Sequence, residues 1–231
     1  LLWQGQGIGT LDVARSPPRP FSAADIALLR SFADQAVIAI QNARLFNETQ
    51  EALGSQTASA DILRVISRSP TDVAPVFDAI VHTALRLFSC TRTVVLRCDD
   101  RNFYPVARAH SDPALASLAG PSAVPIDAAA NFPSRVITSK RLLHLPDWSV
   151  VDVPPHEQLI AQVTGCRASL MLPLLRGDDC IGVLVFQRAV AGAFRDKEIA
   201  LAQSFADQAV IAIENVRLFN ETKEALDQQT A

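Results

Sequence analysis

The chain has 231 residues, of which 49% are hydrophobic and 19% charged. That much apolar surface supports a buried core and excludes a disordered chain. The formal net charge of −3 at pH 7 offers no broad cationic surface for nucleic-acid phosphates, and no run of residues is apolar enough to span a membrane. We therefore expect a globular protein that binds neither nucleic acid nor membrane.

The cysteines form no recognisable motif. They stand at irregular intervals, without a C-x-x-C pair or a histidine at zinc-finger spacing. Cysteine often behaves as a small buried hydrophobe, and reduced thiols are typical of the cytoplasm. We expect a cytoplasmic protein with four free thiols. These are Cys90, Cys98, Cys166 and Cys180.

The first 58 residues recur at the end of the chain. Residues 31–58 match residues 204–231 at 23 of 28 positions, and the same offset of 173 extends back to Leu1. A unit of that size is a domain rather than a solenoid repeat. We predict that residues 1–58 are the last hairpin and helix of an upstream domain in an excised fragment. The hairpin, cut from its parent sheet, is expected to pair with another chain or to pack poorly.

The second copy is expected to be complete. We predict a helical linker over residues 59–71 and a whole domain over residues 72–231. From Phe77 to Phe88, apolar residues follow the i, i+3, i+4 spacing that lays one stripe along a helix. This pattern predicts that the domain begins with an amphipathic helix.

The middle of the domain is the least regular part. Residues 93–107 favour a β-hairpin that turns at 99–102. Residues 111–165 are then rich in proline and alanine, and we expect them to cross over the sheet as a lid. Within this crossover we predict a helix at 134–139, a strand at 141–145 and a helix at 156–163.

The last part of the chain predicts a second hairpin and a long helix. Strand-like runs at 167–175 and 181–186 flank a turn at 176–179, and a helix follows from about Asp196. This order of elements predicts an α+β fold, with an antiparallel sheet that carries its helices on one side.

The closing helix carries a pattern typical of helix pairing. It is apolar around most of its circumference over residues 205–213, so one sheet cannot cover it, and apolar residues recur every seven positions. Residues 38–53 repeat this seam, and Gly54 would favour a break after it. The alternative is a surface helix packed on its own sheet. We predict a homodimer through long N- and C-terminal helices. The predicted interface comprises Ala206, Ala209, Ile213, Val216, Phe219 and Leu226.

Four motifs in the C-terminal third form a set: Leu172–Leu175, Ile181–Leu184, Phe194 with an acid at Asp196 or Glu198, and Phe205–Ala209. Together they resemble the GAF domain family of bacterial signalling proteins, and the resemblance covers essentially the whole chain. It implies an antiparallel sheet flanked by helices, with a small-molecule pocket beneath the crossover. The tandem arrangement resembles sensor histidine kinases of two-component systems and, as an alternative, GAF-linked nucleotide cyclases.

Known chemistries of the family are not supported by the motifs. Cyclic-nucleotide-binding members carry an Asn-Lys pair that is absent from residues 188–193, and bilin-binding members attach chromophore through a cysteine followed by histidine, which no cysteine here has. The polar group from His144 to Glu157 lacks the H-E-x-x-H spacing of a metal site, and no nucleophile elbow occurs. We therefore expect no enzyme and no metal, and the cofactor stays open.

The predicted function is that of a sensory or regulatory module. It would bind a small ligand, or relay a conformational signal, through dimeric helices to a downstream kinase or cyclase domain in the same polypeptide. Two alternatives stay open: a structural dimerisation spacer without a ligand, and a thiol-dependent enzyme such as a GAF-type methionine-sulfoxide reductase that uses Cys166 or Cys90. The candidate ligand-binding residues, chosen from the crossover and the adjoining strand, are Phe132, Ser134, Arg135, His144, Trp148, Arg167 and Ser169.

Overall fold

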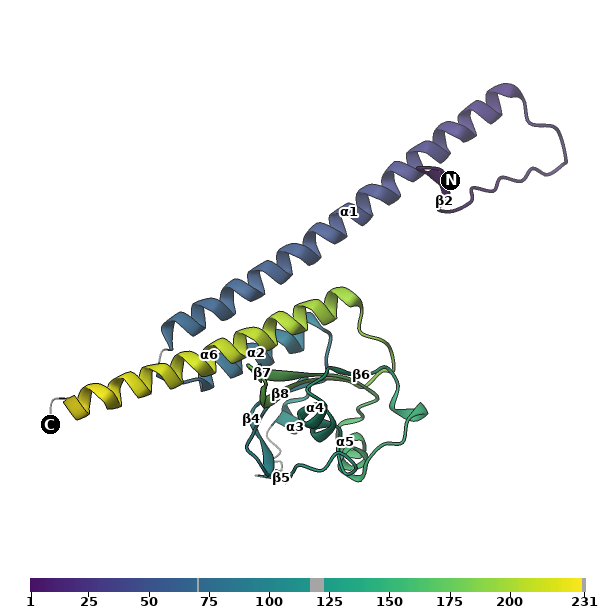
Figure 1. Ribbon diagram of the computed structural model, residues 1–231. Helices are drawn as coiled ribbons and strands as arrows, with labels where there is room; N and C mark the ends of the chain where they lie inside the picture. Colours follow the sequence, from purple (N-terminus) through teal and green to yellow (C-terminus); the bar gives the residue numbers. More distant parts are fainter. Residues whose placement is uncertain (70, 117–122, 230–231) are drawn as a thin grey trace. The chain divides into compact units, whose positions relative to one another are not determined.

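The computed structural model describes residues 1–69, 71–116 and 123–229. The chain divides into two compact units, Leu1–Gly54 and Ser55–Ala231. Helix α1 (Ala23–Arg68) begins in the first unit and ends in the second, and it passes through Gly54 without a break (Figure 1). No helix in the described part of the chain is long and apolar enough to cross a membrane.

The first unit contains a short hairpin and the start of α1. Strands β1 (Leu2–Trp3) and β2 (Gln6–Gly7) pair antiparallel and join no larger sheet among the described residues. The Leu2 side chain is 70% exposed. A reciprocal cap starts the helix, since Asp25 accepts hydrogen bonds from the Ser22 backbone and hydroxyl at 2.8 Å, and the Ser22 hydroxyl accepts one from the Asp25 N–H.

The second unit is built on a six-stranded antiparallel sheet, in the order β5-β4-β3-β8-β7-β6. Both predicted hairpins are confirmed, one between β3 and β4 and one between β7 and β8. The α+β fold with an antiparallel sheet and flanking helices is confirmed as well. The strands are β3 (Arg92–Cys98), β4 (Asn102–His110), β5 (Val124–Pro125), β6 (Leu143–Leu145), β7 (Ala168–Arg176) and β8 (Asp179–Arg188).

Helices cover both faces of the sheet, so the expectation of helices on one side was wrong. The strands are apolar on both faces: along β3, Val95 packs into one buried cluster, while Val94 and Leu96 pack into the other. Each face therefore needs its own cover. Helices α2 (Ala74–Leu87) and α6 (Asp196–Gln229) lie on one face (Figure 1). The crossover contains α3 (Pro113–Ala116), α4 (Phe132–Ser139), the 3-10 turn η1 (Trp148–Val150) and α5 (Pro155–Thr164).

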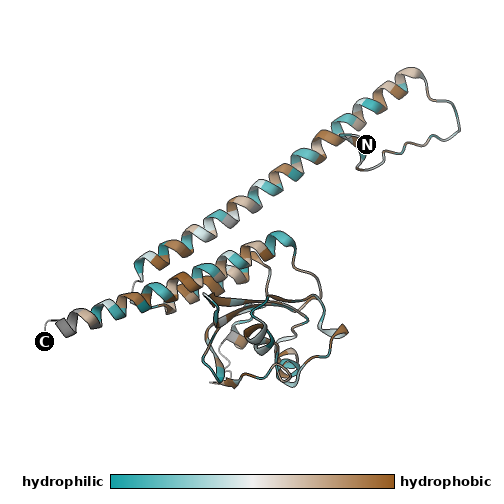
Figure 2. Cartoon of the chain, in the orientation of Figure 1, coloured by the Kyte–Doolittle hydropathy of each residue, from teal (hydrophilic) through white to brown (hydrophobic). Residues whose placement is uncertain are grey.

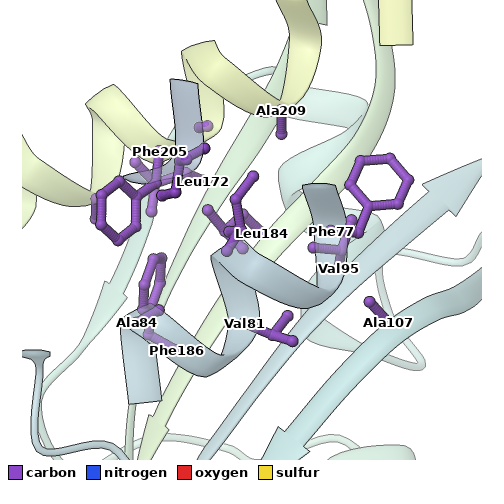
Figure 3. Close-up of a cluster of buried hydrophobic side chains, with 14 of the residues drawn as sticks. Phe77, Val81, Ala84, Val95, Ala107, Leu172, Leu184, Phe186, Phe205 and Ala209 are labelled. Carbon is purple, nitrogen blue, oxygen red and sulfur yellow. The ribbon is translucent and has the colours of Figure 1, made fainter. Parts of the chain in front are cut away.

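The larger core lies between the sheet and the pair α2 and α6. Figure 3 shows Phe77 and Val81 of α2, Leu184 and Phe186 of β8, and Phe205 of α6 converging there. Burying each such side chain stabilises the fold by about 1.5–3 kcal/mol. The C-terminal turns of α1 also belong to this core, including most of the segment predicted as a linker. They contribute Ala58, Ile62 and Ile66.

The predicted dimer residues do not form one surface. Ala206, Ala209 and Ile213 are buried in the core of their own chain, because β7 and α2 cover that side of α6. Val216 is half-buried and Phe219 is 43% exposed. The side chain of Leu226 lies outside the described residues. Hydrophobic residues recur along α6 (brown in Figure 2), and the exposed ones there include Ile211 and Leu218.

Candidate ligand-binding site

A small cavity lies between the sheet and the crossover helices. Its volume is about 40 Å³, which is room for about three water molecules. The sheet forms its floor through Arg92, Val94, Leu96, Phe103, Met171, Val185 and Gln187. The crossover forms its roof through Pro133, His156, Glu157 and Ile160.

A half-buried cation lies on the floor of the cavity. Arg92 of β3 pairs directly with Gln187 of β8, and its Nη1 donates a 2.6 Å hydrogen bond to the Gln187 Oε1. Burial lowers the pKa of Arg92 to about 10, so the guanidinium stays charged at neutral pH. Its planar fork has five N–H donors, and this bond to Gln187 uses one of them.

A buried acid stands in the roof. Glu157 is 1% exposed, and neither of its carboxylate oxygens has a hydrogen-bond partner within the described residues. It occupies the third position of α5, from which a glutamate usually reaches back to the N-cap N–H. Here the N-cap residue is Pro154, which has no N–H to donate. The local sequence thus removes the usual partner of this carboxyl group.

The environment keeps Glu157 poised between its two protonation states. Burial raises the pKa of Glu157 to about 7, although the nearby N–H groups of Phe132 and Glu157 and the charge of Arg135 oppose that shift. At neutral pH the group therefore samples both the neutral acid, which can donate a hydrogen bond, and the carboxylate, which only accepts them.

A neutral imidazole completes the polar lining. Burial, assisted by the charge of Arg92, lowers the pKa of His156. Its ring meets Phe103 edge-to-face, with 6.2 Å between ring centroids. A neutral histidine offers one donor and one acceptor. The cavity thus combines a cation, a titratable acid and a neutral imidazole with a floor that is otherwise mostly apolar.

Four of the sequence-predicted ligand residues come together beside this cavity. The Trp148 Nε1 donates to the Ser169 hydroxyl at 3.1 Å, and the Trp148 ring meets Phe132 edge-to-face at 5.5 Å. Ser134 accepts a hydrogen bond from the Asp127 N–H at 2.9 Å. All four are buried. These contacts hold the crossover onto the sheet, and none of the four lines the cavity.

The other three predicted residues lie apart from the lining as well. The guanidinium of Arg135 stacks 5.0 Å from the Phe132 ring centroid and bonds the carbonyl of Ala128. The Nε2 of His144 accepts a hydrogen bond from the Phe194 N–H at 2.9 Å. The exposed Arg167 reaches a carboxylate oxygen of Asp147 at 3.7 Å. Binding of a ligand by these seven residues stays a prediction.

Sequence reasoning missed the charged residues of the lining. Arg92 opens a strand in which every second residue, Val94 and then Leu96, faces the crossover, so alternation alone points its side chain inward. Glu157 follows a Pro-Pro pair that deprives it of a cap partner. These two signals could have identified the site. No group of three His, Cys, Asp or Glu side chains could hold a metal ion within the described residues.

Comparisons with known proteins agree with the fold. The family model of the GAF domain matches residues 1–40 and 72–213. The formate hydrogenlyase transcriptional activator FhlA of Escherichia coli is 26% identical over 98 residues, which are 42% of this chain and only 14% of that protein.

Solved structures show the same architecture. The GAF domain of a phosphoenolpyruvate-protein phosphotransferase from Coxiella burnetii has a TM-score of 0.61 at 14% identity, covering 74% of this chain and 98% of that one. The free methionine-R-sulfoxide reductase of Neisseria meningitidis, solved with its substrate, has a TM-score of 0.58 at 15% identity, covering 73% and 93%. Since the family model spans most of the residues, this chain belongs to the GAF domain family.

Proposed function

We propose that the second unit is a cytoplasmic, non-catalytic sensory module whose cavity binds a small polar ligand. The ligand presents a hydrogen-bond donor or a cationic group to Glu157 and an acceptor to Arg92. The buried, unpartnered carboxyl group of Glu157 is the observation that carries this proposal. GAF domains are typically ligand-binding sensory or regulatory modules, and a transcriptional activator among the relatives is consistent with a regulatory role.

The energetics favour a ligand with a donor. A buried polar group without a partner costs about 1–3 kcal/mol, and more when it is charged. A donor placed against Glu157 recovers that free energy, and an ammonium or amidinium group would also stabilise the carboxylate form. An acceptor on the same molecule can use the remaining N–H groups of Arg92. A small molecule with both groups therefore matches the lining better than a purely apolar one.

Ligand size connects binding to signalling. Because the cavity holds about 40 Å³, a ligand larger than a few waters would displace part of the roof that α4 and α5 form. Gln187 lies on the floor, and the next residue, Arg188, pairs with Glu198 in the first turn of α6. A ligand that favours one position of these groups would shift the population of α6 states. The helix would then pass the change to a downstream kinase or cyclase domain in the same polypeptide.

The output helix is proposed to pair with a second copy of the chain. Ile211 and Leu218 are 48% and 51% exposed, and they lie seven residues apart on one side of α6. Phe219, at 43% exposed, adjoins them. The buried residues Ala206, Ala209 and Ile213 would hold the helix on its sheet instead.

A thermal-shift screen tests the ligand proposal. The panel contains small amines, amino acids, amidines and nucleobases, and it is applied to the wild type and to Glu157→Gln and Asp152→Asn. Asp152 is an exposed carboxylate near α5 and serves as the control. We expect a compound that raises the Tm of the wild type and of Asp152→Asn, with at least about tenfold weaker binding to Glu157→Gln.

The same screen separates the alternatives. A structural spacer would show no shift with any compound and no retained ligand in native mass spectrometry. A ligand that binds Glu157→Gln as tightly as the wild type would contradict the role of the carboxyl group. The thiol-enzyme alternative through Cys90 or Cys166 gains no support from their sites, because both are buried and burial raises the pKa of each to about 12.

A further inference from the structure

The other two cysteines, Cys98 and Cys180, occupy a different environment. Cys98 ends β3 and Cys180 lies at the start of β8, and both are half-buried. They stand 82 positions apart in the sequence, but β3 and β8 are neighbours in the sheet. The fold therefore brings together two thiols that the sequence spacing separates.

The two cysteines are in direct contact. The Cys98 thiol donates a hydrogen bond to the carbonyl oxygen of Cys180, with 3.1 Å between the sulfur and the oxygen. The strands approach closely beside the pair, since a Cβ on Gly182 would lie 2.2 Å from the Leu96 oxygen. A disulfide needs an S–S distance of about 2.05 Å, so the two sulfur atoms must approach each other before the bond can form.

The pair is electrostatically asymmetric. The adjacent Cys98 side chain, helped by backbone N–H groups and by the charge of Lys140, lowers the pKa of Cys180 to about 7 despite its partial burial. The adjacent Cys180 side chain and burial raise the pKa of Cys98. Lys140 is held beside the turn before β8, where its Nζ donates to the Asp178 carbonyl. Cys180 has the lower pKa of the two and is therefore the candidate attacking thiol; its Sγ also lies 3.2 Å from the Gly182 carbonyl oxygen, to which the protonated thiol can donate.

We propose that Cys98 and Cys180 form a reactive thiol pair, which a hydroperoxide oxidises to an intramolecular disulfide. The Cys180 thiolate attacks one peroxide oxygen, so that an S–O bond forms as the O–O bond breaks. The departing alkoxide or hydroxide takes up a proton, and the product is Cys180 sulfenic acid. Sulfur has given two electrons to the peroxide.

The second step closes the disulfide. The Cys98 sulfur attacks the sulfenic sulfur of Cys180, an S–S bond forms, and the hydroxide leaves as water with the Cys98 proton. In total, two thiols and one hydroperoxide give one disulfide, one alcohol and one water. The bond would join the end of β3 to the start of β8. This proposal is independent of ligand binding at the cavity.

Peroxide treatment and peptide mapping test the pair. The wild-type chain is treated with hydrogen peroxide, its remaining thiols are alkylated under denaturing conditions, and trypsin is added. We expect two of the four thiols to be lost, the mass to fall by about 2 Da, and peptide 98–101 to be joined to peptide 177–188. Dithiothreitol should reverse the change. A link between any other pair, a link between two chains, or four remaining thiols would overturn the proposal.

Variants assign the two roles. In the Cys98→Ser variant, oxidation by peroxide should stop at a Cys180 sulfenic acid, which dimedone traps. The Cys180→Ser variant should lose the rapid reaction with peroxide. Cys166→Ala, which removes a buried thiol outside the pair, should still form the 98–180 link. If Cys180→Ser reacts as fast as the wild type, Cys180 is not the nucleophile and the mechanism is wrong. Should a variant fail to fold, the wild-type peptide map decides the question alone.

Discussion

Arg188 at the end of β8 forms a 2.6 Å ion pair with Glu198 in the first turn of α6. The same guanidinium donates two hydrogen bonds to the carbonyl of Phe88, at 3.0 and 2.7 Å, and stacks 3.9 Å from the Phe194 ring centroid. One side chain thus joins the sheet, the end of α2 and the start of α6. The preceding residue on β8, Gln187, lies on the cavity floor, so Arg188 connects the strand that lines the cavity to the start of α6.

The Glu198→Gln variant tests that ion pair. Burial raises the pKa of Glu198, but hydrogen bonds from the Arg195 N–H and from Arg188 outweigh it, so the pKa is lowered. The stabilisation is therefore present above the unfolded value of 4.5 and is lost as the pH falls through the lowered folded value.

We expect Glu198→Gln to lower the free energy of unfolding by about 1–2 kcal/mol at neutral pH, measured by urea titration. Glu221→Gln removes an exposed i, i+4 partner of Arg217 on the same helix and is the matched control. It should cost less than about 0.5 kcal/mol. Equal losses in the two variants would show that Arg188 and Glu198 form an ordinary surface pair.

Glu157 should make stability fall as the pH rises. Its pKa is about 7 in the folded chain against 4.5 for the free group. Between these values the unfolded chain loses the proton first, so ionisation favours unfolding. The free energy of unfolding should decrease across this range by up to about 3 kcal/mol and then level off.

The Glu157→Gln variant isolates this effect in urea titrations across the same pH range. It cannot ionise, so it should lack the decrease and be more stable than the wild type at about pH 8. Asp152→Asn, with an exposed carboxyl group, should keep the decrease. Parallel curves for the wild type and Glu157→Gln would mean that the carboxyl group is solvated in the folded chain.

Gly182 should be the least replaceable glycine of the sheet. A Cβ there would lie 2.2 Å from the Leu96 oxygen of the neighbouring strand, so Gly182→Ala must push β3 away from β8. We expect a loss of about 3 kcal/mol or more, measured by chemical denaturation. Gly192→Ala meets no atom within 4 Å and should change stability by less than about 0.5 kcal/mol. A well-tolerated Gly182→Ala would refute the close approach.

Pairing of α6 with a second copy should depend on its exposed leucine. Leu218→Asp places a charge in the proposed seam and should convert a dimer to a monomer in sedimentation experiments, without loss of the fold. Leu159→Asp changes a 62% exposed leucine on α5 and should leave the dimer intact. A wild type that is monomeric at high micromolar concentration, or a Leu218→Asp variant that still dimerises, would exclude this interface.

The regular elements were predictable because their patterns are local. The alternation of apolar residues and the turn-forming residues between them correctly predicted the positions of both hairpins. Helix α6 begins at Asp196 as expected. Which element covers each face of the sheet or of α6 depends on tertiary packing and not on the local sequence. Ala209 and Ile213 belong to an apolar helix that could meet either a partner or its own sheet, and only the packing of β7 and α2 decides between them.

The site was harder to predict than the fold. Polar residues of the irregular crossover, such as His144 and Arg167, were predicted as ligand residues; they contact Phe194 and Asp147 and do not line the cavity. Arg92 and Glu157 looked ordinary, because a strand-end arginine and a first-turn glutamate are usually solvated or capping groups. Their positions around one cavity depend on how α5 crosses β3 and β8, which no local pattern specifies.

A crystal structure of the chain with a compound from the thermal-shift screen tests the central claim most directly. The account predicts electron density between α5 and the sheet, with a donor atom of the ligand within about 3.2 Å of a Glu157 carboxylate oxygen and an acceptor near Arg92. A ligand bound elsewhere on the chain, with Glu157 and Arg92 unchanged, would contradict it.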